Sequence, residues 1–341
     1  MPSTYSTDTL VGVIADLKRA PKWLLDRFFT KVSQDESEEI HFDVILGKRR
    51  IAPFCSPLVA GKVVQSKGRE VRSFRPAYVK DKRRFNPSEA FKRSVGEKIG
   101  GSLSATQRRD AYLAAELADQ IDMLDRRMEV MASEAIRTGM CTVEGEDYPT
   151  QVVDFRRAAA LTPAALAGTA RWGQADDNPL KNLKDWKLLV LKESGVAPVD
   201  VIMGVDAYEE FSSDTKVEKR LDTRNITNAS LAGGTIAGEG GTFMGTIDGF
   251  NIFAYGGWYV DPLDGVEKEI FPAGQIAMTS PLVEGVRAHG AIVDADCLQA
   301  LPYFPKMWKE NDPGVEWLML QSSPLTVPSR PDATLGVQVL G

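Results

Sequence analysis

A histidine, two aspartates and a cysteine lie close together near the C-terminus, in the stretch HGAIVDADC that begins at His289. Such side chains bind metal ions or act as acids and bases. If residues 291–295 are extended, alternation along a strand places His289 and Cys297 on one face and Asp294 and Asp296 on the other. A zinc site needs ligands that converge on one point. The spacing therefore favours a half-buried strand that ends in a polar turn over a metal or hydrolytic site.

The rest of the chain supplies few other groups for catalysis. Its histidines and cysteines are His41, His289, Cys55, Cys141 and Cys297. The cysteines are widely spaced and form no CxxC pair, which favours buried free thiols over a disulfide framework or zinc knuckle. No GxSxG, HExxH or Walker A motif occurs, and the glycine-rich segment 232–245 contains no lysine. We therefore expect no enzymatic activity, no cofactor and no metal.

Composition indicates a folded, soluble protein. The chain has 341 residues, of which 43% are hydrophobic, enough for one to three domains with real cores. No apolar run approaches the ~20 residues that span a bilayer, and the N-terminus lacks the basic-then-apolar order of a signal peptide. We expect the protein to be made and kept in a cytoplasm, without a membrane partner.

Charge is unevenly distributed along the chain. Residues 48–93 carry fourteen Lys and Arg and three acids, a net of +11, so the remainder carries −17 of the overall −6. Basic segments often bind nucleic acid, and a DNA-binding module that uses 48–93 is one interpretation. An acidic remainder, however, repels phosphates and attracts the basic segment of another copy. The division therefore favours self-assembly.

Two N-terminal pieces have too little apolar material to fold alone. Residues 1–46 combine a short amphipathic helix, expected in KWLLDRFFTKV, with an acidic patch at 33–39. Residues 47–95 alternate short apolar and basic groups, with turn signals at Gly61 and Gly68. This pattern predicts a long two-stranded hairpin. Such a ribbon is marginally stable by itself and invites pairing with a neighbour.

The strongest helix signal covers residues 105–138, where one apolar stripe from Leu113 to Ala135 follows the helical period. Ser104 and Gln107 fit a capping box, and Gly139 is a natural stop. A hairpin is expected at 139–155. Residues 160–300 then alternate helical and extended signals, among them a helix expected in NPLKNLKDWKLLVLKESG, with Gly195 past its end, and a buried strand expected in VDVIMG. The C-terminus returns to extended structure. The predicted class is α+β.

The C-terminal third resembles the major capsid protein of lambda-like tailed bacteriophages. The residues that carry the resemblance are Gly285, Arg287, Gly290, Ile292, Asp294, Ala295, Asp296, Pro305, Lys306, Trp308, Asp312, Pro313, Gln321, Ser322, Pro324, Leu325, Pro331, Asp332, Val337, Gln338 and Val339. SPLVAGKVVQSKGREVRSFRPAYVKDK in the basic segment, the turn after the long helix and LDTR at 221–224 are also similar and occur in the same order. The resemblance thus covers most of the chain, although 96–104 and 233–245 depart from it.

The resemblance implies the Hong Kong 97-like capsid fold. The implied parts are an N-terminal arm at 1–46, an extended loop at 47–95, a peripheral domain at 96–159 with its spine helix at 105–138, an axial domain at 160–305, and a return to the peripheral domain at 306–341. Asp294 and Asp296 then belong to the scaffold of the fold, and no catalytic role is carried over.

The implied function is that of a major capsid protein. Copies would form the pentamers and hexamers of an icosahedral head around double-stranded DNA, without sequence-specific DNA binding. The resemblance implies a separate scaffolding protein and a portal as partners, and leaves room for a decoration protein. It places the protein in the virion capsid, after assembly in the host cytoplasm. An encapsulin-type shell that holds cargo protein is the nearest alternative.

Residues at subunit contacts follow from the uneven charge. The candidates are the cations Arg49, Arg50, Lys62, Lys67, Arg69, Arg72, Arg83 and Arg84 and the acids Glu36, Glu38 and Glu39. Some coats of this fold cross-link Lys to Asn, but Lys62 and Lys67 are expected to be ordinary solvated or salt-bridged cations. Gly96, Gly100 and Gly101, between the loop and the helix, are candidate hinge points for shell expansion. An ordinary loop is the alternative there.

Overall fold

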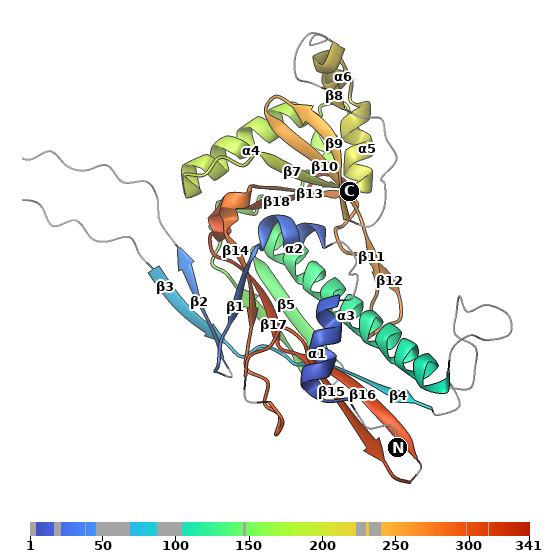
Figure 1. The fold of residues 1–341 in the computed structure, drawn as a ribbon. Coiled ribbons are helices and arrows are strands. Elements are labelled where there is room, and N and C mark those ends of the chain that lie inside the picture. The colour runs from blue at the N-terminus through green and yellow to red at the C-terminus, as the bar shows by residue number, and fades with distance from the viewer. Residues whose placement is uncertain are drawn as a thin grey trace, which may run out of the picture.

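The protein combines helices and sheets in two stacked bodies (Figure 1), here seen in a computed structural model. The structure describes residues 5–16, 22–37, 39–45, 69–86, 104–145, 148–222, 230–231, 240–297, 299–312 and 314–341. We call the body built on a six-stranded sheet the upper body, and the one that contains two three-stranded sheets the lower body. One long helix, α3, runs along the lower body and reaches the upper one.

Helix α3 spans Ala105–Thr138, the bounds expected from the sequence. The capping box of Ser104 and Gln107 is present, and Gly139 ends the helix at φ 72°. The predicted apolar stripe is buried and serves two cores. Leu113 to Leu124 pack with strands of the lower body, whereas Met128 to Ile136 join a core that includes Ile202 and Ala277 of the upper body.

The upper body is a sheet with the strand order β18-β13-β7-β10-β9-β8. Its elements are β7 (Asp200–Gly204), β8 (Ser230–Leu231), β9 (Gly240–Ile247), β10 (Phe250–Gly256), β13 (Gln275–Thr279), β18 (Leu335–Gln338), α4 (Pro179–Ser194), α5 (Val205–Ser213) and α6 (Thr215–Asp222). The predicted helix that stops at Gly195 and the buried strand after it are confirmed. Since side chains alternate along β7, Val201 and Met203 face the core beneath α4 and α5, and Ile202 faces the core shared with α3.

The lower body has two main sheets, β1-β14-β17 and β15-β16-β4. Its strands are β1 (Lys31–Gln34), β4 (Val79–Phe85), β14 (Gly285–His289), β15 (Phe304–Glu310), β16 (Val315–Ser322) and β17 (Pro324–Pro328). Helices α1 (Thr7–Asp16) and α2 (Trp23–Phe28) lie against it (Figure 1). Two-stranded pairs complete the fold: β2 (Ile40–Ile45) with β3 (Arg69–Phe74), β5 (Met140–Gly145) with β6 (Tyr148–Asp154), and β11 (Trp258–Val260) with β12 (Glu267–Glu269). The hairpin expected at 139–155 is β5–β6.

The C-terminal strand β18 leaves the lower body and adds to the upper sheet beside β13. It crosses the end of α3 at Gly336, where a Cβ atom would lie 2.0 Å from the carbonyl oxygen of Arg137. A glycine is therefore required at this crossing, because real Cβ atoms do not approach a backbone oxygen so closely. The C-terminal strand is thereby fixed against the end of α3.

The two-stranded hairpin expected within 47–95 is wrong for its described part. Strand β3 pairs with β2, from the segment assigned to the arm, and β4 pairs with β16 near the C-terminus. Pro76 separates β3 from β4 and has no N–H to extend a ladder, while Phe85 is buried in the core against α3. The basic segment therefore divides between two sheets. Residues 46–68 and 87–103 lie outside the described residues.

The helix expected over KWLLDRFFTKV is also shorter than expected. Helix α2 ends at Phe28, and the chain continues into β1, which lies parallel to β14. Phe28 and Phe29 are both buried, and the Phe29 carbonyl accepts a hydrogen bond from the Arg287 guanidinium. Tertiary packing thus redirects a segment whose apolar residues alone favour a longer helix.

Candidate functional site: subunit contact surfaces and the junction beneath them

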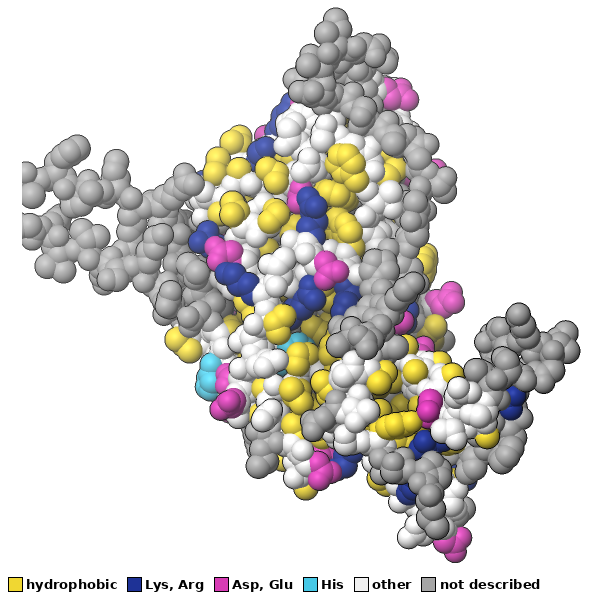
Figure 2. Space-filling model, viewed as in Figure 1, with side chains coloured by type: hydrophobic (Ala, Val, Ile, Leu, Met, Phe, Trp, Pro, Cys, Tyr) yellow, Lys and Arg dark blue, Asp and Glu magenta, His cyan; other side chains and the backbone are white. Residues whose placement is uncertain are grey.

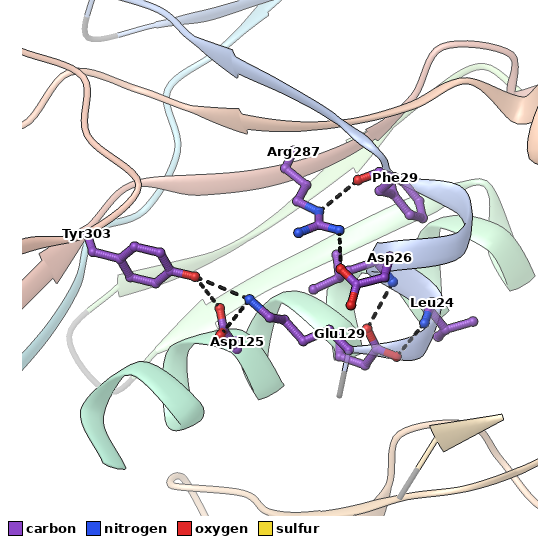
Figure 3. A network of polar contacts seen from close by, with 9 residues as sticks. Leu24, Asp26, Phe29, Asp125, Glu129, Arg287 and Tyr303 are labelled. Carbon is purple, nitrogen blue, oxygen red and sulfur yellow. Dashed lines mark hydrogen bonds and ion pairs between the residues drawn. The ribbon is translucent and has the colours of Figure 1, made fainter. Parts of the chain in front are cut away.

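Helix α2 lies at the junction of the two bodies, where its first backbone N–H groups donate hydrogen bonds to a buried glutamate (Figure 3). Glu129 of α3 accepts hydrogen bonds from the backbone N–H groups of Leu24, at 2.7 Å, and Leu25, at 3.1 Å. The hydroxyl of Tyr255, on β10, donates to the same carboxylate at 3.0 Å. One side chain therefore ties the N-terminal segment, α3 and the upper sheet together.

A second contact joins the residue before α2 to the lower body. The Lys22 ammonium lies 2.6 Å from Asp125, whose side chain is 3% exposed, and the Tyr303 hydroxyl donates to the same carboxylate at 2.6 Å (Figure 3). A buried carboxylate that lost its cation would be strongly destabilising. This ion pair therefore fixes where the N-terminal segment enters the junction.

Two arginines complete the junction. Arg287 of β14 donates to Asp26 at 2.6 Å as well as to the Phe29 carbonyl (Figure 3). Arg27 donates to the buried Asp200 of β7 at 3.0 Å and lies 4.6 Å from the ring centroid of Phe253. The six residues of α2 are thus held by groups from α3, β7, β10 and β14.

Burial shifts the pKa values of two titratable groups near this junction, so the free energy of folding depends on pH. Burial raises the pKa of Glu129 to about 7, although its three hydrogen-bond donors favour the ionised form. Burial also lowers the pKa of His289 to about 4, and the neighbouring cations Arg287 and Lys22 add to the effect. His289 is therefore neutral at physiological pH, whereas Glu129 is close to its midpoint.

The stretch HGAIVDADC has a structural role. Contrary to the expected strand at 291–295, β14 ends at His289, and Asp294 and Cys297 close a turn as an isolated bridge. Asp294 accepts from the Lys306 ammonium at 2.8 Å and from the Gln321 amide at 3.2 Å. Both oxygens thus fix the turn to β15 and β16. Within the described residues, no group of three or more His, Cys, Asp or Glu side chains is placed to hold a metal ion.

The predicted contact residues fall into three groups. Arg49, Arg50, Lys62, Lys67 and Glu38 and the hinge candidates Gly96, Gly100 and Gly101 lie outside the described residues. Arg69 begins β3, and Arg72 of the same strand donates to the Asp154 carbonyl at 3.3 Å. Glu36 and Glu39 are exposed beside β1. The structure of one subunit does not bring the two sets of charges together, and their contacts between subunits remain predictions.

Arg83 and Arg84 differ although they are neighbours on β4. Arg83 lies 2.9 Å from Asp81, 2.8 Å from Glu116 and 2.7 Å from Asp119, so its charge is matched inside its own chain. Arg84 points to the opposite face of the strand and is exposed. On the face seen in Figure 2, Lys and Arg side chains likewise lie beside Asp and Glu side chains. An exposed cation that has no acidic neighbour is therefore a candidate for a contact with another molecule.

The junction was not predicted from the sequence. A signal was present, because Asp125 and Glu129 lie beside the apolar stripe of α3, directly after Leu124 and Met128 and one helical turn apart. Charged residues are rarely buried unless they are paired. Their partners could not be assigned, since they come from segments more than a hundred residues away in sequence: Lys22 for Asp125, and Leu24, Leu25 and Tyr255 for Glu129.

Comparison with known proteins agrees with this architecture. The family model for phage major capsid protein E matches residues 6–339. The major capsid protein of Enterobacteria phage P21 is 29% identical over 98% of this chain and 99% of its own length. That of Escherichia phage lambda is 27% identical over 99% of both chains.

Solved structures show the same fold. The crystal structure of a prophage capsid protein from Escherichia coli CFT073 superposes with a TM-score of 0.76 at 22% identity, over 99% of this chain and 100% of the other. The α+β fold is thus that of Hong Kong 97-like capsid proteins. Within the described part of the chain, no helix is both long and apolar enough to cross a membrane. The chain belongs to the phage major capsid protein E family, whose members are structural proteins of the virion head and not enzymes.

Proposed function

We propose that copies of this chain assemble into the pentamers and hexamers of an icosahedral head that encloses double-stranded DNA. The observation that carries the proposal is the β2–β3 pair, a two-stranded sheet that projects from the lower body (Figure 1). Such a pair is marginally stable alone, and Val71 on β3 is 65% exposed. A neighbouring subunit would cover both the apolar side chain and the open strand edges.

The proposed domains are those that the resemblance implies. We propose an N-terminal arm at 1–46, an extended loop at 47–95, a peripheral domain at 96–159 and an axial domain at 160–305. Residues 306–341 would return to the peripheral domain, apart from β18, which joins the upper sheet. Assembly would take place in the host cytoplasm with a scaffolding protein and a portal, and a decoration protein could bind the finished shell.

Electron microscopy of the protein expressed with its neighbouring genes tests the proposal. Closed icosahedral particles are expected. A monodisperse species of 37.4 kDa under all assembly conditions would reject it. DNA binding by free subunits should be weak at physiological salt, because a net charge of −6 opposes the phosphate contacts that dominate such binding. Submicromolar binding would favour the DNA-binding module instead.

We further propose that the extended loop, which contains the basic segment 48–93, lies across an acidic surface of a neighbouring subunit. Charge reversal at Arg69 and Arg72 should block assembly at moderate salt and leave the subunit folded, whereas lysine at both positions should preserve assembly. Normal shells from the charge-reversal variant would exclude these residues as contacts. The glycines at 96, 100 and 101 are proposed hinges for expansion of the shell. Unchanged expansion after replacement of all three by alanine would remove that role.

A further inference from the structure

The sheet β15-β16-β4 has an outer face that the described residues of its own subunit cover only at one end, where Phe304 packs with Ile292 and Asp294 accepts a hydrogen bond from Gln321. Its inner face is closed by Phe85, Met307, Leu318 and Leu320, which pack against α3. On the outer face, the strand register aligns Trp308, Trp317 and Arg84 in one row. The next row contains Lys306, Met319 and Lys82. The outer face thus combines two tryptophans, a methionine, several cations and one acid, Glu310, which accepts a hydrogen bond from the Trp317 indole at 2.9 Å.

The tryptophans are partly exposed and lie parallel to each other. Their ring centroids are 6.4 Å apart with an interplanar angle of 23°. The Lys82 ammonium lies over both rings, 4.0 Å from the centroid of Trp317 and 5.2 Å from that of Trp308. Tryptophan, methionine and arginine are enriched at protein interfaces, and tryptophan and arginine at their energetic centres. This face therefore has the composition of a protein-binding surface.

Three cations on this face have no carboxylate partner among the described residues. Lys80, Lys82 and Arg84 occupy the three exposed positions of β4. Within the described residues, no ion pair joins any of them to an acid. Other cations of the same sheet are matched, for example Lys306 by Asp294 at 2.8 Å. The unmatched charges are thus concentrated beside the two tryptophans, and we call Lys80, Lys82, Arg84, Trp308 and Trp317 the tryptophan–cation face.

A matching acidic element lies elsewhere on the same chain. The turn after β1 presents Glu36 and Glu39, both exposed and without an ion pair in the described part of the chain. Asp35 fixes this turn by accepting from the N–H groups of Ser37, at 3.2 Å, and His41, at 2.9 Å. The turn is held to its own subunit by a hydrogen bond from the Ala291 N–H to the Ser37 carbonyl. A turn that is ordered in advance loses little entropy on binding.

We propose that the tryptophan–cation face of one subunit binds the acidic turn of a second copy, through Glu36 and Glu39. The inference rests on the proposed self-assembly and names two surfaces that meet in it. Charge complementarity carries it, since exposed unmatched cations and exposed unmatched acids occur on one chain but do not pair within the part of it that the structure describes. Val32, 56% exposed on β1 beside the turn, supplies apolar surface for the tryptophans. Duplex DNA fits the face less well, because its base faces are not available for stacking on an indole.

A charge-swap experiment on the full-length protein, expressed with its neighbouring genes, tests the pairing. One variant carries Lys82→Glu and Arg84→Glu, another carries Glu36→Lys and Glu39→Lys, and a third combines all four. Each of the first two should reduce the particle yield by about tenfold or more, since like charges then face each other. The combined variant should restore the yield, because the attraction returns with its direction reversed. Lys82→Arg with Arg84→Lys is the matched control and should assemble normally.

The outcomes separate this inference from the proposed function. Normal particles from both charge-reversed variants would overturn the pairing and leave the capsid function intact, and so would a combined variant that stays defective. Absence of particles from the wild type would instead reject the proposed function.

A second measurement keeps the pairing testable where a variant fails to fold. The double variant Glu36→Cys with Arg84→Cys should form disulfide-linked oligomers in assembled shells, while each single variant should stay monomeric on a non-reducing gel. Monomers from the double variant would overturn the pairing. A gel-shift assay with duplex DNA covers the other occupant: binding by wild-type subunits that is lost in the Lys82→Glu, Arg84→Glu variant, together with normal particle yield, would assign the face to DNA.

Discussion

Replacement of Glu129 by glutamine should change how the stability of the subunit depends on pH. The folded pKa of about 7 lies above the ordinary 4.5, so between these values the folded state binds more protons than the unfolded state. The contribution of this group to stability is therefore complete below about pH 4.5 and is lost as the pH rises to about 7. The difference between the two pKa values corresponds to about 3 kcal/mol.

His289 has the opposite effect. Its folded pKa of about 4 lies below the ordinary 6.5, so its contribution is present above about pH 6.5 and is lost as the pH falls to about 4. The size is again about 3 kcal/mol. In the wild type the two dependences oppose each other over about pH 4.5 to 6.5. The Glu129→Gln variant should therefore lose stability steeply on acidification, whereas His289→Leu should gain it.

Urea unfolding of the unassembled subunit, followed by tryptophan fluorescence between pH 4.5 and 7.5, measures these slopes. Trp23 lies in α2 beside the junction and reports on it directly. Glu209→Gln, at an exposed site on α5, is the control and should leave the slope unchanged. Parallel curves for the wild type and Glu129→Gln would refute the assignment of a buried, half-ionised carboxylate at this position.

Three further predictions concern single contacts. Lys22→Met leaves Asp125 buried without its cation and should lower the free energy of unfolding by about 3 kcal/mol in urea titrations; a change within error would show that the ion pair is dispensable. Ser104→Ala removes the capping box of α3 and should cost about 1 kcal/mol, visible as a lower Tm by circular dichroism, and an unchanged Tm would contradict it. Burial raises the pKa of the Cys141 thiol above its ordinary range, so iodoacetamide should label it in urea but not in the native subunit; rapid native labelling, detected by peptide mass mapping, would show the thiol to be accessible.

Local sequence patterns predicted the helices and strands whose buried residues follow a regular spacing or an unbroken run. Helix α3 is predictable because a buried stripe, a capping box and a stop glycine all indicate the same bounds. The same holds for α4 with Gly195 and for the continuous apolar run of β7. In α3 and α4 one surface of the helix faces a core, so the periodicity is visible in the sequence, whereas β7 is buried on both faces and appears as an unbroken apolar run.

Pairings between distant segments could not be predicted in this way. Strand β4 meets β16 across more than two hundred residues, and β1 is the parallel partner of β14. The alternation of apolar and basic residues fits both a hairpin and an edge strand of another sheet, so the sequence pattern could not distinguish the two. The junction depends on the same distant pairings. Glu129 belongs to the junction only because α2 presents its first N–H groups to it.

The position of α3 has a consequence for how the subunit can be divided. Its first half is part of one core and its second half part of another. A piece of the chain that kept only one of these cores would leave an apolar strip of the same helix in water, so neither body should be obtainable by truncation. The two cores should also melt together, in a single cooperative transition, because loss of either removes half the support of a continuous helix.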